Sequence, residues 1–219
     1  MTSDIRPVKV WDLPTRLFHW ALVALLITSY VTAEMDELEW HMRSGECILA
    51  LLLFRLAWGV IGSETARFAR FVRGPRAVWR YFLPTETESP PGHNPAGGWA
   101  VLAMLAILCA QVATGLFADD DISEMGPLGR FVSRAVRKKL TGLHHRIFWL
   151  LVAIAALHVG AIAFYRVARK RNLLAPMVTG FARLPAGIRA PVLRPLWLAA
   201  VILVCAGAVA AWVASFGDG

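Results

Sequence analysis

Long apolar runs alternate with short polar segments along the whole chain. About 20 consecutive apolar residues cross the hydrocarbon core of a bilayer as one helix, because a backbone in lipid must satisfy its own hydrogen bonds. Five runs have this character, although Arg55 interrupts the second one. The pattern predicts an all-α membrane protein with five transmembrane helices, at Leu17–Ala33, Gly45–Gly62, Gly97–Ala118, Ile147–Tyr165 and Pro195–Phe216.

The polar segments between these runs predict the orientation in the membrane. Residues 1–16 are too long and too mixed for the basic region of a signal peptide, so we expect an uncleaved first helix. Arginine and lysine concentrate in residues 1–16, 67–80 and 166–194, which fall on one side, against a smaller basic run at 130–139 on the other. The positive-inside rule then predicts a multi-pass protein of the bacterial inner membrane, with a cytoplasmic N-terminus and a periplasmic C-terminus.

The remaining composition excludes several classes of function. The formal net charge of +8 follows from this topology and gives no reason to expect a nucleic-acid partner. The sequence holds no metalloprotease motif, nucleophile elbow or phosphate-binding glycine-rich loop, so we expect no separate catalytic residues. Three cysteines without a pairing pattern lie in the apolar runs, as is typical of small buried hydrophobic residues. They are Cys47, Cys109 and Cys205.

Two histidines in the fourth apolar run carry the strongest chemical signal. His144 and His158 are fourteen residues apart, and the residues between them are almost all apolar. On an α-helix this spacing returns the side chain to within roughly 40° of its starting direction, about 21 Å further along the axis. A neutral imidazole costs free energy in hydrocarbon unless its nitrogens are bound. The spacing therefore predicts one metal centre near each side of the membrane, as in a protein that holds two haems.

Depth in the membrane predicts which histidines meet. With the N-terminus inside, His19 on the first helix lies near the inner surface, at the depth of His158. His41 opens the second helix on the outer side, where the fourth helix begins with His144. A haem iron takes its axial ligands from above and below one planar ring, so both must lie at one depth. We therefore predict an inner haem on His19 and His158, and an outer haem on His41 and His144, within a helical bundle.

Two other histidines are alternatives that this argument leaves open. His145 is rotated by about 100° from His144 and is the main competitor for the outer ligand position. We interpret it as a neighbour that faces another helix or a haem propionate. His93 lies in a Gly, Asn and Pro-rich loop outside the apolar runs, where a turn or capping role is more typical than metal binding.

Three arginines are candidates to pair with haem propionates. Arg55 lies fourteen residues after His41, so it projects from the same face of the second helix at the depth of the inner haem. A guanidinium inside the bilayer requires a buried anion or a polar cavity, and a propionate supplies that anion. Arg146 is placed to serve the outer haem in the same way, and Arg16 to assist the inner haem from the membrane surface.

The mode of haem attachment follows from a missing motif. The sequence contains no C-x-x-C-H, the usual site of covalent c-type attachment. Both haems are therefore expected to be b-type, held by axial ligands and packing alone.

Several segments resemble one bacterial family of di-haem b(561)-type cytochromes, which includes the b-type cytochrome subunits of membrane-bound nickel-iron hydrogenases. The resemblance runs from about Val10 to Gly180 and rests on VWDLPTRLFHW, RFARFVRGPRAVWRY, GHNPAGGW, QVATGLF, LTGLHHRIF, LHVGAIAFY and NLLAPMVTG. It implies a four-helix transmembrane bundle within residues 1–180 that holds two b haems. Residues 181–219 then form a linker and an additional C-terminal transmembrane helix, whose alanine-rich surface is suited to packing on the bundle, on a partner subunit or in an oligomer.

The resemblance also implies site residues and a function. The family's ligand positions match His144, His158, His19 and His41. Electrons are expected to pass through the two haems between the quinone pool and a periplasmic redox partner, such as a hydrogenase, a dehydrogenase or a c-type cytochrome. For the quinone we favour the inner side, where Arg16, Arg55 and residues 67–80 stabilise an anion.

Two alternatives stay open. One is an enzyme that oxidises superoxide with quinone as acceptor, because the basic side chains within residues 130–139 suit a small anion as well as an acidic protein. The other is a haem-free membrane anchor or transporter. Whether the chain acts as an enzyme by itself depends on this choice.

Overall fold

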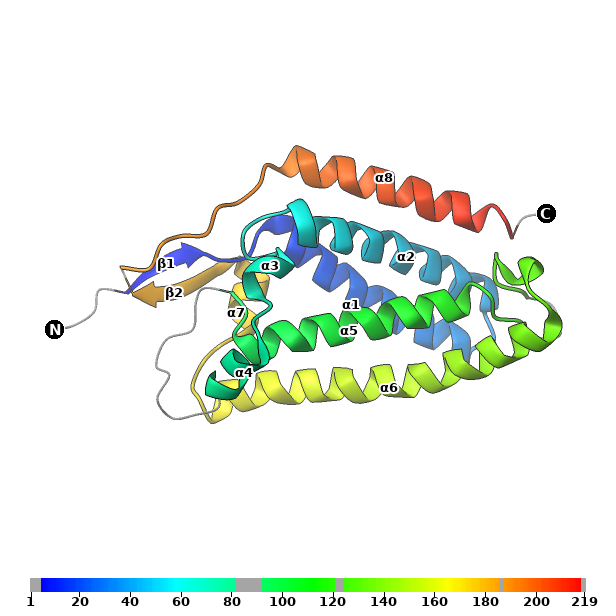
Figure 1. The fold of residues 1–219 in the computed structure, drawn as a ribbon, viewed down its shortest axis with the longest axis horizontal. Helices are drawn as coiled ribbons and strands as arrows, with labels where there is room; N and C mark the ends of the chain where they lie inside the picture. Colours follow the sequence, from blue (N-terminus) through cyan, green and yellow to red (C-terminus); the bar gives the residue numbers. More distant parts are fainter. Residues whose placement is uncertain (1–4, 82–91, 121–123, 186, 218–219) are drawn as a thin grey trace. The chain divides into compact units, whose positions relative to one another are not determined.

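The computed structural model describes residues 5–81, 92–120, 124–185 and 187–217. Within them, 5 helices are long and apolar enough to cross a membrane. Each overlaps one run expected from the sequence, so the five transmembrane helices are confirmed as helices of sufficient length. They are α1 (Leu13–Glu34), α2 (Leu38–Ile61), α5 (Pro95–Gly115), α6 (Arg134–Val167) and α8 (Leu196–Ala214), all labelled in Figure 1.

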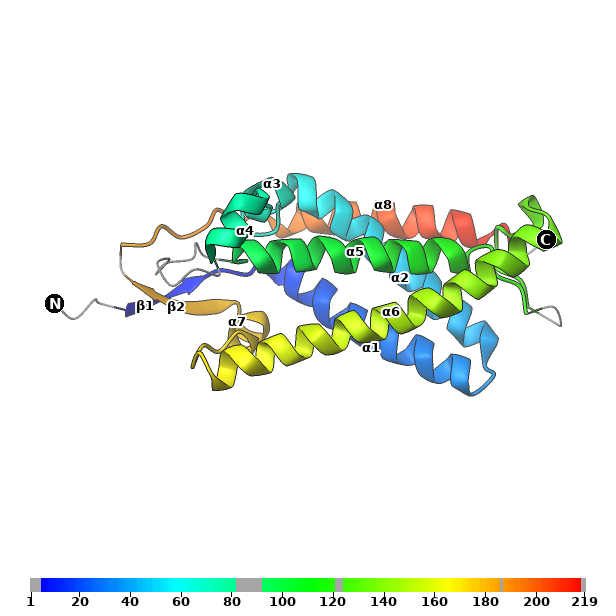
Figure 2. The same cartoon turned by 60° about the horizontal axis from the view of Figure 1, so that its bottom comes forward.

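Shorter elements occupy the connections. Two short helices, α3 (Phe68–Phe71) and α4 (Pro75–Tyr81), follow α2 and lie beside the start of α5 (Figure 2). A 3₁₀ turn at Gly129–Phe131 precedes α6, and α7 (Leu174–Thr179) follows it.

The chain divides into two compact units, and each long helix contributes a segment to each of them. The first unit contains the short helices and both strands, and the second contains the turn from α1 to α2 and the connection from α5 to α6. The first unit comprises Met1–Leu17, Leu56–Ala103 and Ala156–Ala199, and the second comprises Phe18–Arg55, Met104–Ala155 and Ala200–Gly219.

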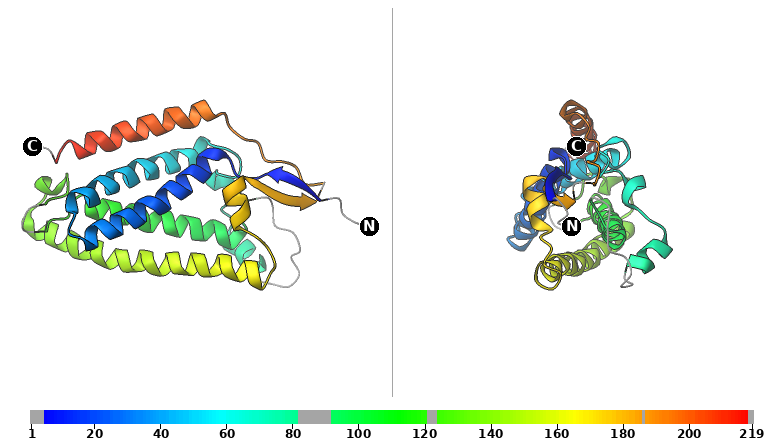
Figure 3. Two further views of the ribbon diagram at one scale, coloured as in Figure 1. Left: turned by 180° about the vertical axis from the view of Figure 1, so that it is seen from behind. Right: turned by 90° about the vertical axis from the view of Figure 1, so that its left-hand side faces the viewer.

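A small antiparallel sheet in the first unit was not expected from the sequence. Strand β1 (Ile5–Lys9) pairs with β2 (Phe181–Pro185), as the two arrows of Figure 3 show. In the register Lys9 lies opposite Phe181. Beyond the sheet, the backbone N–H groups of Val10 and Trp11 donate to the carbonyl of Gly180. Each strand contains a proline and neither shows a clear alternation of apolar residues, so no pattern predicted them. The sheet ties the segment after Gly180 to the N-terminal segment.

Side-chain caps set the starts of two long helices in this unit. Asp12 Oδ1 accepts a 2.8 Å hydrogen bond from the Thr15 N–H and begins α1. Asn94 Oδ1 accepts a 2.6 Å hydrogen bond from the Gly97 N–H and begins α5 at Pro95. Both follow the usual N-cap pattern, with proline tolerated in the first turn. His93 stands next to this cap, and its ring contacts Trp11 and Phe71 at centroid distances of 4.7 and 4.6 Å.

Helix α6 begins earlier than the sequence predicted. Its apolar part starts near Ile147, and we expected the helix to begin with His144, but the helical backbone starts at Arg134. The extra turns are rich in arginine and lysine, so hydropathy does not reveal them. His144 therefore lies well inside the helix, where its backbone direction is fixed.

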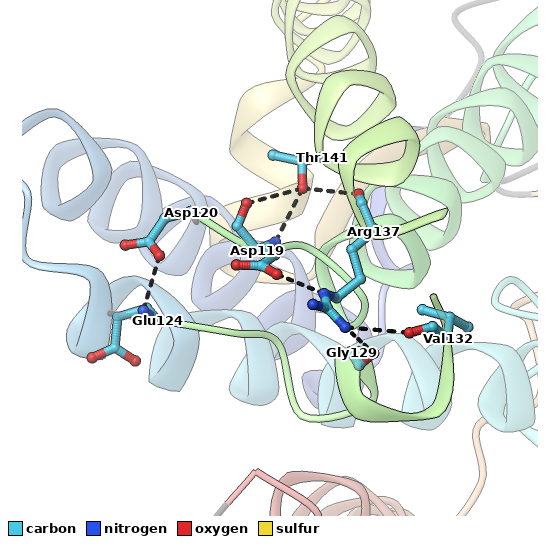
Figure 4. A network of polar contacts seen from close by, with 7 residues as sticks. All are labelled: Asp119, Asp120, Glu124, Gly129, Val132, Arg137 and Thr141. Carbon is cyan, nitrogen blue, oxygen red and sulfur yellow. Dashed lines mark hydrogen bonds and ion pairs between the residues drawn. The ribbon is translucent and has the colours of Figure 1, made fainter. Parts of the chain in front are cut away.

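A polar network in the second unit holds this extension (Figure 4). Arg137 Nε lies 2.5 Å from Asp119 Oδ2, and its Nη1 donates to the carbonyls of Gly129 and Val132. The Thr141 hydroxyl accepts a hydrogen bond from the Asp119 N–H at 3.0 Å. Arg137 thus holds the segment between α5 and α6 against the first turns of α6, and Asp119 compensates its charge.

Candidate haem-binding site

The second unit brings His41 and His144 together, as the sequence predicted. His41 lies in the first turn of α2, and His144 projects from α6. Their ring centroids are 6.2 Å apart, and the ring planes are nearly perpendicular at 86°. Both side chains are half-buried.

The same nitrogen of each imidazole is held by a backbone carbonyl. His41 Nδ1 lies 2.8 Å from the carbonyl oxygen of Ser29 on α1, and His144 Nδ1 lies 2.9 Å from that of Gln111 on α5. A carbonyl oxygen only accepts, so Nδ1 carries the hydrogen in both rings and Nε2 keeps its lone pair. A metal-bound histidine usually donates its other ring N–H in this way, which fixes the tautomer and the ring orientation.

The separation of the rings fits a metal between them. Two imidazoles bound on opposite sides of one ion, with bonds of about 2 Å, place their ring centroids about 6 Å apart. The donor set of two neutral imidazoles is one of those that hold the iron of b-type haem. The residues present therefore fit a haem at this position.

The surroundings of His144 also fit a group that is bound beside it. A Cβ atom built on Gly115 would lie 2.9 Å from His144 Cε1, so only glycine leaves room for the ring here. The Gln111 amide nitrogen lies 3.1 Å from His144 Nε2, while Gln111 Oε1 is buried without a hydrogen-bond partner. A buried acceptor without a partner is costly, so Gln111 Oε1 is suited to receive a donor from a group bound beside His144.

The exposure of side chains along α6 distinguishes His144 from its neighbours. Half-buried residues recur every three or four positions and form one stripe that includes both His144 and His158. His145 and Arg146 lie off this stripe and are exposed. The arrangement favours His144 over His145 as the ligand and leaves Arg146 directed away from the stripe. The stripe comprises Arg137, Leu140, Thr141, His144, Ile147, Phe148, Leu151, Ile154, His158, Ile162 and Tyr165.

The histidines predicted for the inner haem belong to different units. His19 lies on the part of α1 in the second unit, where its ring makes an edge contact with Trp20 at 4.8 Å between centroids. His158 lies on the part of α6 in the first unit. Both are half-buried, and their pairing stays a prediction from the sequence.

Two of the predicted arginines differ in burial, since Arg55 is buried and Arg16 is half-buried. Arg55 is only 3% exposed. Arg16 Nη1 donates to the carbonyl of Val178, while its Nε is buried without a hydrogen-bond partner. The unused Nε of Arg16 is suited to an anionic group such as a propionate.

Sequence reasoning missed the residues that support the outer pair. Ser29, Gln111 and Gly115 come from two helices. Ser29 and Gln111 contact the ligand rings through both backbone and side chain, and Gly115 makes room by its lack of a side chain. Ser29 and Gln111 carried only a weak signal, as polar residues within apolar runs, and the role of Gly115 is recognised only once the helices are packed.

Comparisons with known proteins show the family to which the chain belongs. The family model for prokaryotic cytochrome b561 matches residues 10–180. The probable Ni/Fe-hydrogenase B-type cytochrome subunit of Rhodobacter capsulatus is 23% identical over 79% of this chain and 80% of its own length. Its counterpart in Bradyrhizobium diazoefficiens is 21% identical over 79% of this chain and 85% of its own length.

No solved structure matches the chain. The family model nevertheless spans most of the sequence, including all four histidines that the spacing and depth arguments selected. With five helices of membrane-spanning length and a facing histidine pair, the chain belongs to the prokaryotic cytochrome b561 family and is a multi-pass membrane electron-transfer protein.

Proposed function

We propose that this cytochrome holds two b haems and conducts electrons between a periplasmic redox enzyme and the membrane quinone pool. The observation that carries the proposal is the geometry of His41 and His144, whose rings stand 6.2 Å apart with both Nδ1 atoms anchored on carbonyls. Such a pair suits an axially ligated iron, and a haem bound there supplies one-electron chemistry.

The chain's own residues hold and tune the cofactors. Ser29 and Gln111 direct the Nε2 atoms of the outer ligands, and Gly115 leaves space for the His144 ring. The inner haem is assigned to His19 and His158, by the matched depths on α1 and α6. Arg55 and Arg16 then pair with propionates and hold the potentials up through their positive charge.

The partner is proposed from the relatives. The two proteins compared above are named as Ni/Fe-hydrogenase cytochrome subunits, so a hydrogenase or a similar dehydrogenase is the favoured electron donor. The excess of arginine and lysine in residues 1–16, 67–80 and 166–194 supports a cytoplasmic N-terminus. The His41 and His144 haem then faces the periplasmic donor.

Spectroscopy and haem quantification on the purified chain test the proposal. We expect two haems per chain, a b-type absorption spectrum, and reoxidation of the reduced haems by a soluble ubiquinone analogue. A colourless protein would instead favour an anchor or transporter. Superoxide-driven quinone reduction by the isolated chain would assign it to the superoxide-oxidising type.

A further inference from the structure

A cluster of two tyrosines and an asparagine lies at the start of α5, in the first unit. Tyr81 is the last residue of α4 and Tyr165 lies in the last turn of α6, and their hydroxyl oxygens are 2.5 Å apart. Asn94 Nδ2 donates to the Tyr81 hydroxyl at 2.9 Å, while Asn94 Oδ1 caps α5. Since the cap fixes Asn94, the amide in turn fixes the hydroxyl pair.

Asn94 contacts both hydroxyl groups. Its amide donates to the Tyr81 oxygen at 2.9 Å and to the Tyr165 oxygen at 3.5 Å, and either hydroxyl can donate to the other. In the arrangement in which Tyr81 donates to Tyr165, the Tyr165 O–H points at a further acceptor. Burial, and next the hydrogen bond with Tyr165, raise the pKa of Tyr81 to about 12, so this phenol stays protonated at neutral pH.

Two features suit the cluster to a position between the proposed inner haem and the membrane surface. Tyr165 follows His158 by seven residues on the half-buried stripe of α6, which is two turns or about 10 Å along the helix. Trp79 on α4 is 73% exposed, as tryptophans are at the membrane interface. Quinone approaches such a place from the lipid, and protons reach it from water.

We propose that Tyr165 is the proton donor for quinone reduction near the inner haem, with Tyr81 relaying protons from water and Asn94 as a positioning residue. This inference rests on the function proposed above. The quinone takes two electrons from reduced haem iron, one at a time, and two protons. For each proton, the Tyr165 O–H bond breaks and an O–H bond forms on a quinone oxygen. Tyr81 then reprotonates Tyr165, water reprotonates Tyr81, and neither tyrosine is oxidised.

The test compares two electron acceptors on the purified, haem-loaded protein. Reduced haems are mixed either with decylubiquinone, which needs protons, or with ferricyanide, which does not. In Tyr165→Phe we expect the decylubiquinone rate to fall by about 100-fold, the usual scale of a lost general acid, with the ferricyanide rate unchanged. The matched control is Tyr30→Phe, because Tyr30 is the one tyrosine of the three that lies outside the cluster, where it stacks on Phe148 in the second unit.

Two further variants examine the relay. Tyr81→Phe should slow decylubiquinone reduction and change its solvent isotope effect, which is the ratio of the rates in H₂O and D₂O. Asn94→Asp keeps the oxygen that caps α5 but replaces the amide donor with an acceptor, so it should slow the same reaction while the haem spectrum stays unchanged.

The outcomes separate this inference from the function on which it rests. If the wild type does not reduce decylubiquinone, the proposed function itself is wrong. If the wild type does, and Tyr165→Phe matches it in rate and in solvent isotope effect, the tyrosine relay is wrong and the function stands. Should Tyr165→Phe lose haem, Tyr81→Phe decides in the same way, since a wild-type rate and isotope effect there would overturn the relay.

Discussion

The indole Nε1 of Trp58 donates a 2.9 Å hydrogen bond to Asp12 Oδ2, the oxygen of the α1 cap that the helix backbone does not use. Trp58 is fully buried and Asp12 is 3% exposed. One carboxylate thus begins α1 and also satisfies a buried indole from the end of α2.

Replacing this carboxylate should destabilise the protein. Asp12→Ala removes an N-cap, worth about 1 kcal/mol, and leaves a buried indole N–H unpaired at a cost of about 1–3 kcal/mol. We expect a clear fall in the melting temperature, measured through the haem absorption of purified protein. Glu34→Ala, at an exposed position, should melt like the wild type. Equal melting of both variants would mean that the Trp58 contact contributes little.

The two adjacent histidines of α6 should respond differently to replacement. His144→Ala removes a ligand from the half-buried stripe and should leave one haem per chain, whereas His145→Ala changes an exposed position and should leave two. Haem extraction and protein quantification give the ratio directly. The reverse result would move the outer ligand by one residue.

The perpendicular imidazoles predict a spectroscopic signature. The plane of an imidazole bound to iron determines which iron d orbital it overlaps. Two ring planes at 86° to each other would affect two such orbitals almost equally and leave them nearly equal in energy. The ferric outer haem should therefore give a strongly anisotropic low-spin EPR signal that disappears in His41→Ala. A signal of ordinary rhombic shape would show that the rings turn parallel when haem is bound.

Much of this architecture could be predicted from the sequence, and the reasons differ between elements. The apolar runs and the fourteen-residue spacing of His144 and His158 depend only on helix geometry, so the five helices and the shared stripe followed directly. The hydroxyl pair of Tyr81 and Tyr165 joins residues 84 positions apart, and β1 pairs with β2 across most of the chain. Such pairings depend on packing that no local pattern encodes.

The glycine beside the outer ligand should be sensitive to a single methyl group. In Gly115→Ala the new Cβ would lie 2.9 Å from His144 Cε1, so the ring must shift. We expect partial loss of the outer haem or a changed midpoint potential, measured by redox titration. Gly142→Ala on α6 is the matched control, because nothing lies within 4 Å of its Cβ position. Identical titrations for both variants would argue against close packing at Gly115.

Removing the buried charge of Arg55 should lower one haem potential. A positive charge nearby favours the reduced, less cationic haem, so Arg55→Leu should shift one midpoint downwards by several tens of millivolts, on the order of 1–2 kcal/mol at an effective dielectric constant of about 20. Arg43→Leu removes an exposed arginine of the same helix that pairs with Glu39, and it should leave both midpoints in place. Unchanged potentials in Arg55→Leu would exclude a role in haem tuning.

The network of Arg137, Asp119 and Thr141 fixes the first turns of α6 before any partner is bound. Because these contacts already order the extension, a protein that docks on it does not need to freeze a loose segment, and little conformational entropy is lost on binding. Binding can then be both specific and short-lived. A rapid exchange of partner molecules on a surface that is already ordered would suit a membrane electron-transfer protein that serves many turnovers.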